Sequence, residues 1–315
     1  MKKVLLATSA LVLTAGAAAA DISLSGSARM GLVYADNGTD PSTTQFSSRV
    51  RIVFTASGET DTGLSFGASV RADQFGGNQK TDSDGDTVGS SGTTNGDSTV
   101  FISGAFGKLT MGDVSGAADA LVGQVSGVGY GPNDDTQEIN FIGTVKTALY
   151  YEYSAGALTF GAGIGQLDTE EDTYNIGVKY AADGYSVALA WESLDSVVDA
   201  DDVDMISLGG SATFGATTVK ARVSDLDISG VDTAYALSVD YAMGDTTLTA
   251  FYVDYGNSGE YLNPYDSGDS DVKHIGLGAA YNLGGGATLA GGVTRQNNNT
   301  SPDATIANLG LKFSF

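Results

Sequence analysis

The sequence contains no cysteine, four prolines and a single histidine. Without cysteine, neither a disulfide framework nor a thiolate metal site can stabilise the fold. The lone histidine, His274, leaves few of the nucleophile-and-base pairs on which covalent catalysis depends. Beyond residue 20, no apolar run reaches the roughly 18 residues of a membrane-spanning helix. The stability of the chain must come from another kind of architecture.

Positive charge is also scarce. The chain has 15 lysines and arginines against 38 aspartates and glutamates, a formal net charge of −23. Such a surface repels nucleic acid, so no nucleic-acid partner is expected. High acidity together with 44 glycines would suit a disordered chain, but 15 tyrosines and 12 phenylalanines argue for β-structure instead.

The first 20 residues resemble a targeting segment. Lys2 and Lys3 precede an apolar run from Val4 to Ala15, and small residues surround Ala20. This pattern predicts a signal peptide over residues 1–20, cleaved to leave a single domain over 21–315. The alternative is an uncleaved anchor, although the apolar run is shorter than the roughly 20 residues that a span needs.

From Asp21 onward, hydrophobicity alternates with a period of two. In the first segment Ile22, Leu24 and Met30 share one face, and serines and Arg29 share the other. Alternation of this kind is typical of half-buried strands. It predicts sixteen strands, at 22–34, 45–57, 63–73, 98–105, 108–113, 147–154, 157–166, 173–181, 184–194, 203–214, 217–226, 231–243, 245–256, 272–283, 286–296 and 304–315.

The connections between these strands alternate between short turns and long loops. Short turns such as Ala155-Gly156 and Gly215-Ala216 are separated by long segments such as 74–97, 114–146 and 257–271. We therefore predict an all-β fold, a transmembrane up-and-down antiparallel β-barrel of 16 strands in a bacterial outer membrane. A soluble β-sandwich would also alternate, but its second face would not stay small and charged strand after strand. A β-solenoid is disfavoured because no fixed short repeat occurs.

Aromatic residues at the ends of the predicted outward faces fit the girdles of such barrels. They are Tyr34, Tyr150, Tyr180, Tyr185, Trp191, Tyr235, Tyr241 and Tyr281.

The inward face carries the candidate functional residues. Arg29, Arg49, Arg51 and Arg71 lie on the polar face of the first three strands, and Lys312 on the last strand extends the set. Either these are ordinary solvated cations on a wet sheet face, or they form a basic wall at a pore constriction.

The segment 114–146 is too long for a simple hairpin connection. Acidic residues lie at its start and along it: Asp113, Asp119, Asp134, Asp135 and Glu138. If this segment folds back into the barrel, its carboxylates would face the arginines and create a transverse field across the narrowest point.

Several segments resemble the general-diffusion porins of α-proteobacteria. They are Ile22 to Gly31, Ser47 to Thr55, Thr99 to Lys108, Met111 to Asp113 and Leu309 to Phe315. The resemblance implies a homotrimer, a third external loop folded into the lumen, and arginines that face acids on that loop. It also implies contact with outer-membrane lipid and lipopolysaccharide, and passage of small polar solutes and ions.

No cofactor is required by this reading, but the resemblance suggests calcium near the loops. Asp82, Asp84 and Asp86 place carboxylates at alternate positions, which suits an oxygen-liganded cation. They are the candidate metal ligands, although the distal glutamate of an EF-hand loop is lacking. The alternative is a hydrated acidic loop.

The predicted function is a general diffusion pore, without enzymatic activity. A substrate-specific channel, for example for sugars, is the main alternative, and it would be expected to show a row of inward aromatic rings. A barrel plugged by its own loops would not conduct. A barrel hydrolase would need His274 beside a serine and an orienting acid, and no Gly-x-Ser-x-Gly motif is present.

Overall fold

The computed structural model describes residues 21–76, 80–81, 87–88, 93–131, 136–143, 148–165, 171–196, 202–264, 271–299 and 301–315. The predicted signal peptide, residues 1–20, lies outside this part of the chain.

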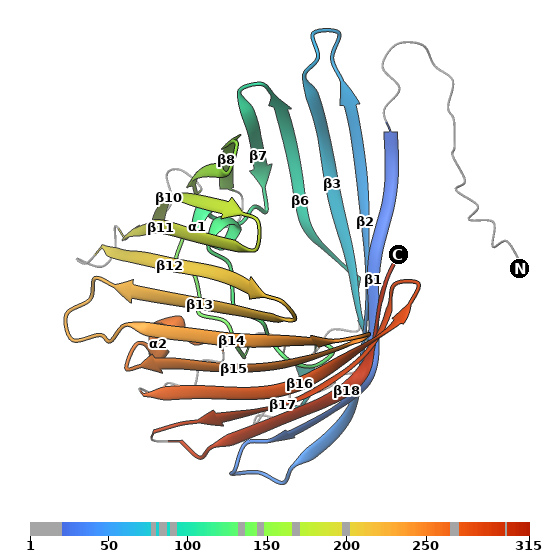
Figure 1. Ribbon diagram of the computed structural model, residues 1–315, viewed down its shortest axis with the longest axis vertical. Helices are drawn as coiled ribbons and strands as arrows, with labels where there is room; N and C mark the ends of the chain where they lie inside the picture. The colour runs from blue at the N-terminus through green and yellow to red at the C-terminus, as the bar shows by residue number, and fades with distance from the viewer. Residues whose placement is uncertain are drawn as a thin grey trace, which may run out of the picture.

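Sixteen strands form a closed antiparallel barrel in which each strand pairs with its neighbours in the chain and β18 pairs with β1 (Figure 1). Because every barrel strand has two partners, no row of unpaired N–H and C=O groups faces the membrane. The strands are β1 (Asp21–Asp36), β2 (Thr43–Glu59), β3 (Ser65–Gly76), β6 (Thr93–Gly104), β7 (Gly107–Gly112), β8 (Ala148–Ala155), β9 (Leu158–Ile164), β10 (Glu171–Ala182), β11 (Tyr185–Ser196), β12 (Val203–Phe214), β13 (Thr217–Leu226), β14 (Ala234–Met243), β15 (Thr246–Gly256), β16 (Val272–Gly284), β17 (Ala287–Asn297) and β18 (Ala304–Ser314).

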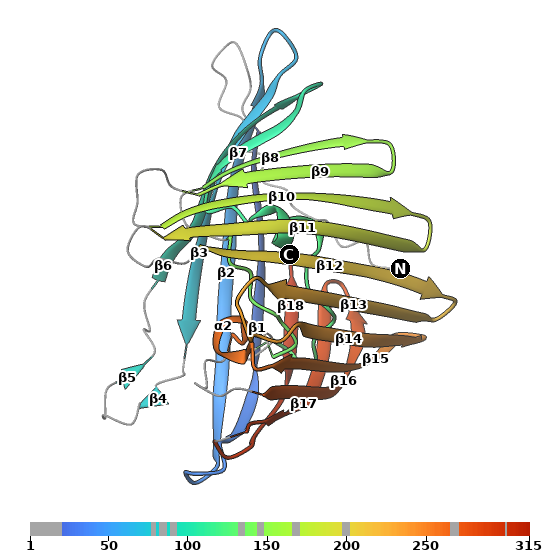
Figure 2. The same ribbon diagram turned by 90° about the vertical axis from the view of Figure 1, so that its left-hand side faces the viewer.

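Three small features were not predicted. A two-stranded hairpin, β4 (Lys80–Thr81) with β5 (Thr87–Val88), lies beyond the ends of β3 and β6 (Figure 2). Two short helices, α1 (Ala117–Leu121) and α2 (Gly259–Leu262), lie within the long segments that follow β7 and β15. Neither helix of the described chain is long and apolar enough to span a membrane.

The sixteen predicted strands are confirmed, but the prediction of a loop over 74–97 is wrong at both of its ends. Strand β3 continues to Gly76 and β6 begins at Thr93. The register shifts there, from Val70 opposite Ser98 to Arg71 opposite Gly96. This bulge and the polar sequence of 93–97 interrupt the apolar alternation. Backbone pairing therefore extends both strands over residues that the sequence pattern does not identify as strand.

The alternation of short and long connections is also confirmed. Two-residue turns join β8 to β9, β12 to β13 and β14 to β15, and their glycines adopt left-handed φ angles near +61°. Loops join the strands at the other end of the barrel. The two ends are called the short-turn end and the long-loop end below.

The outer face is apolar around the whole barrel. Side chains such as Leu24, Leu208 and Leu277 are about half exposed, as expected of a wall that faces lipid. The assignment of Tyr150 to this face is wrong: Tyr151 and Tyr153 point outward, and the Tyr150 hydroxyl donates to the inward Glu152 at 3.3 Å. The Tyr-Tyr-Glu-Tyr sequence of β8 leaves the parity of that strand ambiguous.

The described parts of the segment from Asp113 to Gly143 (113–131 and 136–143), called the inner loop, fold into the barrel as predicted. Helix α1 packs against β9, β10 and β11 (Figure 2), and the hydrophobic core lies between the inner loop and the inward faces of β12 to β16. Val125, Val128 and Ile139 of the loop are buried there against Met205, Phe251 and other wall residues.

Glycines of the inner wall make room for the inner loop. A Cβ atom added at any of these positions would lie 2.7–3.1 Å from a loop side chain. Such separations are shorter than van der Waals contact, so a side chain at these positions would displace the loop. The positions are Gly161 and Gly177 against Leu121, Gly209 against Val122, Gly278 and Gly292 against Val128, and Gly31 and Gly310 against Tyr130.

We predict that Gly292→Val destabilises the folded barrel. Its Cβ would lie 2.8 Å from the Val128 Cβ and 2.9 Å from the backbone nitrogen of Gly129, so the loop must move. Overpacking of this kind costs about 1–3 kcal/mol. Urea unfolding in detergent micelles measures the change. Ala279→Val on β16 is the control, because Ala279 is exposed on the outward face; equal losses in both variants would contradict the prediction.

Candidate functional site

The predicted basic wall lies on three adjacent strands and the closing strand. Arg29 on β1 is opposite Arg49 on β2 and opposite Lys312 on β18, so three cations form one cross-strand row. Like charges in register normally destabilise a sheet pair. Lys312 is exposed to the lumen, where water and counter-ions screen its charge and offset part of this repulsion.

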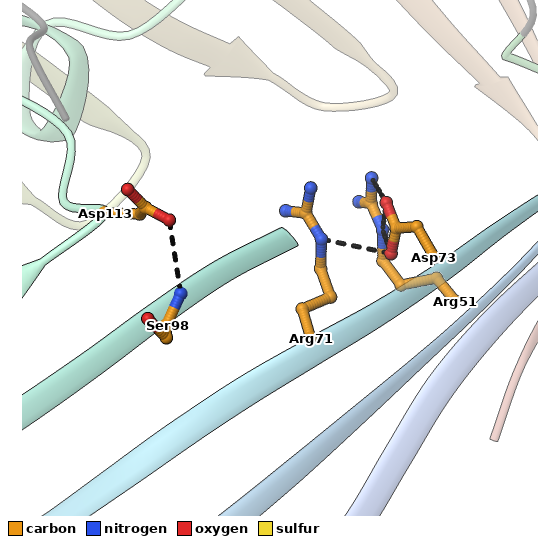
Figure 3. A network of polar contacts seen from close by, with 5 residues as sticks. All are labelled: Arg51, Arg71, Asp73, Ser98 and Asp113. Carbon is orange, nitrogen blue, oxygen red and sulfur yellow. Dashed lines mark hydrogen bonds and ion pairs between the residues drawn. The ribbon is translucent and has the colours of Figure 1, made fainter. Parts of the chain in front are cut away.

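Arg51 and Arg71 share a carboxylate that was not predicted. Asp73, opposite Arg51 in register, accepts from the Arg51 Nε and Nη2 at 2.9–3.1 Å and from the Arg71 Nε at 3.1 Å (Figure 3). Asp73 is buried, whereas both arginine side chains are about one quarter exposed. One of the charges of this arginine pair is therefore neutralised within the wall.

Asp113 stays at the root of the inner loop. Its carboxylate accepts from the backbone N–H of Ser98 at 3.3 Å, and its own N–H donates to the Ser98 carbonyl at 3.0 Å (Figure 3). These bonds fix the point at which the chain leaves β7 for the lumen.

The first half of the inner loop, from Ala117 to Tyr130, is hydrogen-bonded to successive strands of the wall. The Ala117 N–H donates to Asn175 on β10 at 2.7 Å, and the Tyr130 N–H donates to Asn308 on β18 at 3.0 Å. Between them, Ser126 donates to Ser238 and Asp240 on β14 at 2.9 and 2.6 Å. The loop therefore follows the wall from β10 round to β18.

The second half of the inner loop, from Thr136 to Gly143, is hydrogen-bonded to other side chains of the wall. The Thr136 carbonyl lies 2.7 Å from His274 Nδ1 on β16, and the Glu138 carbonyl accepts from the Tyr255 hydroxyl on β15 at 2.6 Å. The Gly143 N–H donates to Glu192 on β11 at 2.9 Å. His274, predicted to face inward, does so and is buried beneath the loop.

Arg222 on β13 donates hydrogen bonds to both halves of the inner loop. Its Nη1 donates to the Gln124 Oε1 at 2.8 Å and to the Ile139 carbonyl at 2.7 Å. Its Nε donates to Ser224, and its guanidinium stacks 3.8 Å from the centroid of the Phe141 ring. The side chain is 1% exposed. A buried cation with this many hydrogen-bond partners holds the two halves of the loop against the wall.

Of the described loop acids, Asp113 lies at the root of the loop, and Asp119 and Glu138 lie near Arg222. Asp119 and Glu138 both interact electrostatically with Arg222, and Asp119 also with Glu192. Asp134 and Asp135 lie outside the described residues, as do Asp82, Asp84 and Asp86. In the part of the chain that the structure describes, no group of three or more acidic or histidine side chains could hold a metal ion.

Tyr130 places the inner loop against β1 and β18. Its ring covers Gly31 and Gly310, beside Arg29. Burial raises the pKa of the Tyr130 phenol above its ordinary value, although the charge of Arg29 acts in the opposite direction. The phenol is therefore neutral at physiological pH.

Sequence analysis missed Asp73, Glu192 and Arg222. Asp73 follows Arg71 by two residues, so strict alternation places both on one face. Arg222 likewise continues the polar face of Lys220 and Ser224. Alternation shows that these side chains face inward, but their roles depend on which of them the inner loop covers.

We predict that Arg222→Ala destabilises the barrel by about 3 kcal/mol, because it leaves loop acceptors and the buried Glu192 without their cation. The free energy of unfolding in micelles measures the loss.

Arg295→Ala is the matched control. Arg295 pairs with Asp303 at 2.7 Å, but its side chain is 53% exposed, so its loss should cost less than about 1 kcal/mol. A similar loss in both variants would show that Arg222 does not fasten the loop.

The architecture matches known proteins. The family model described as Gram-negative porin matches residues 7–301. The porin of Rhodobacter capsulatus is 37% identical over 94% of this chain and 100% of its own. The porin of Fuscovulum blasticum is 32% identical over 76% of this chain and 96% of its own. A solved porin structure with 35% identity superposes with a TM-score of 0.71 and covers 94% of this chain and 100% of its own.

A closed barrel of sixteen strands, an apolar outer face, an inner loop along the lumen wall and these relatives agree on one conclusion. The chain belongs to the Gram-negative porin family and is an outer-membrane β-barrel that forms a water-filled diffusion pore for small hydrophilic solutes.

Proposed function

We propose that the constriction of this pore is the gap between the inner loop and the basic wall of Arg29, Arg49, Arg51, Arg71 and Lys312. Passage is passive, sorted by size and by a field across this gap, and involves no enzymatic step. The working unit is a homotrimer.

The path of the inner loop is the observation that carries the proposal. The loop packs on or bonds to strands from β9 round to β18 and reaches Gly31 on β1. Tyr130 lies near Arg29 on β1 and Ser47 on β2, and Arg49 and the Arg51–Asp73–Arg71 group on β2 and β3 continue the wall that the loop faces. Solutes must then pass between the loop and these cations.

The charges on the two sides differ in sign. Four arginines and Lys312 are offset on the wall by Asp73, whereas the loop contributes Asp119 and Glu138, and Asp134 and Asp135 by sequence. Between low-dielectric walls such a field orders water and favours small polar solutes over apolar ones of equal size. The net charge of −23 should add a weak preference for cations, because the mouth concentrates them.

The environment of His274 supports a channel without catalysis. The ring is 1% exposed, sits edge-on to Tyr255 and contacts the Thr136 carbonyl. A histidine so enclosed cannot act as a general base toward a solute in the lumen. The calcium site at Asp82, Asp84 and Asp86 stays a prediction.

We predict that replacing Arg49, Arg51 and Arg71 with glutamine raises the potassium-to-chloride permeability ratio at least about twofold at 0.1 M salt. The effect should shrink at about 1 M, where the screening length falls to roughly 3 Å. Zero-current potentials of single channels in planar bilayers measure the ratio.

Arg295→Gln, at the long-loop end, serves as the control and should change little. Current that closes in three equal steps supports the trimer. If folded wild-type barrels carry no current, the pore itself is disproved; an unchanged ratio in the triple variant refutes only the placement of the constriction.

Asp73→Asn should shift selectivity in the opposite direction. Removing this carboxylate leaves Arg51 and Arg71 without their shared partner, so chloride permeability should increase relative to potassium. Asp303→Asn removes an exposed, paired carboxylate at the long-loop end and is the matched control. If both variants shift the zero-current potential equally, the effect of Asp73 is not local.

A further inference from the structure

A cavity of about 230 Å³ opens between the inner loop and the wall, away from the basic wall described above. Leu121 to Val125 of the loop cover one side, and β10 to β13 form the other. Its wall residues Lys179, Ser186, Ser211 and Lys220 all lie within a few residues of short turns. The cavity therefore lies on the short-turn side of the inner loop.

Two lysines flank this cavity from opposite sides. Lys179 projects from β10 and Lys220 from β13, with β11 and β12 between them. At about 4.8 Å per strand, three spacings separate their backbones by about 14 Å across the wall, and the register, which aligns Lys179 with Arg222, offsets them by two residues along it. Two four-carbon stems can reach from both sides toward one small ligand. The intervening wall positions are small, namely Ala188, Gly209 and Gly210, which is why space remains there.

Two hydroxyl groups lie in the same cross-strand row as Lys220. Ser186 is opposite Ser211 in register, and Ser211 is opposite Lys220. The Ser186 and Ser211 hydroxyl oxygens are 3.0 Å apart, so one donates to the other and one hydroxyl hydrogen stays available. Ammonium and hydroxyl donors around a small cavity suit an anion with several oxygens.

The two lysines of the cavity are not engaged in ion pairs with any residue that the structure describes. Within the described residues, no carboxylate forms an ion pair with Lys179 or Lys220. The third cation of the cavity, Arg222, is balanced by Glu192 and Asp119 and is engaged with the loop. The nearby Asp240 accepts from Ser126 and Thr249, both at 2.6 Å. Both lysine ammonium groups are therefore available to a ligand, although the carboxylates of Glu192, Asp119 and Asp240 offset the total charge of the region.

We propose that this cavity is a binding site for small oxyanions of the phosphate class, where they pause after the constriction on the short-turn side. Lys179 and Lys220 supply the charge, and the Ser186–Ser211 pair supplies a hydroxyl donor. The inference rests on the chain being a conducting pore, and adds to it a saturable site that chloride does not fill in the same way.

The test titrates inorganic phosphate against the potassium chloride current of full-length protein in planar bilayers, at constant ionic strength and neutral pH. Phosphate should reduce the wild-type current along a saturation curve. In Lys179→Gln/Lys220→Gln, half-saturation should require about tenfold more phosphate, and in each single variant about threefold more. The current without phosphate reports whether each variant is folded and open.

Lys273→Gln is the matched control, because Lys273 is 41% exposed at the long-loop end and paired with Asp254 at 3.5 Å. Its phosphate curve should coincide with the wild-type curve. A wild-type current that does not saturate with phosphate, or an equal shift in the control, overturns the site while leaving the pore intact. A wild-type protein that never conducts defeats the pore itself.

Discussion

Every feature of this molecule depends on the pairing of backbone groups in a solvent that cannot hydrogen-bond. An unpaired N–H or C=O in hydrocarbon costs several kcal/mol, so a sheet in lipid must have no edge. The pairing of β18 with β1 meets this requirement, and the Phe315 backbone completes it with two bonds to Gly26 at 2.7 and 3.0 Å. Closure makes disulfides unnecessary and explains how a cysteine-free chain of this size is held together.

Closure of so many strands also leaves a wide lumen, which the inner loop partly fills. A barrel of sixteen strands is too wide for wall side chains to fill. The chain places its hydrophobic core inside the barrel, on one side of the lumen, between the loop and β12 to β16. Glycines on the wall permit the close approach of the loop. Arg222 donates hydrogen bonds to both halves of the loop. The abundance of glycine, which resembles disorder in composition, is here a condition of packing.

The strands were predictable because lipid outside and water inside impose alternation on every one of them. Tyr150 shows the limit: where aromatic residues occur at successive positions of β8, both parities satisfy the pattern. The extension of β6 back to Thr93 was invisible for a different reason. Its pairing uses backbone groups, and its side chains are polar on both faces.

The site was predictable in its cations but not in their partners. Alternation placed Arg29, Arg49, Arg51 and Arg71 on one wall because they lie on adjacent strands, and the structure keeps them there. It could not separate an arginine that faces water from one that fastens a loop, since Arg222 follows the same periodicity. That distinction depends on contacts between Arg222 and residues more than 80 positions away in sequence, which no local pattern records.

The distribution of charge along the pore follows from the same division of roles. Carboxylates concentrate in and beside the long loops, cations line the middle of the wall, and Lys179 and Lys220 lie toward the short-turn end. In the pore as we propose it, a solute meets potentials of opposite sign in sequence rather than one uniform field. Each region attracts ions that the other repels, so their effects on ions of either sign partly cancel over the whole path. Such an arrangement lets solutes of both signs through while it sorts them locally, which is the behaviour that a general diffusion pore requires.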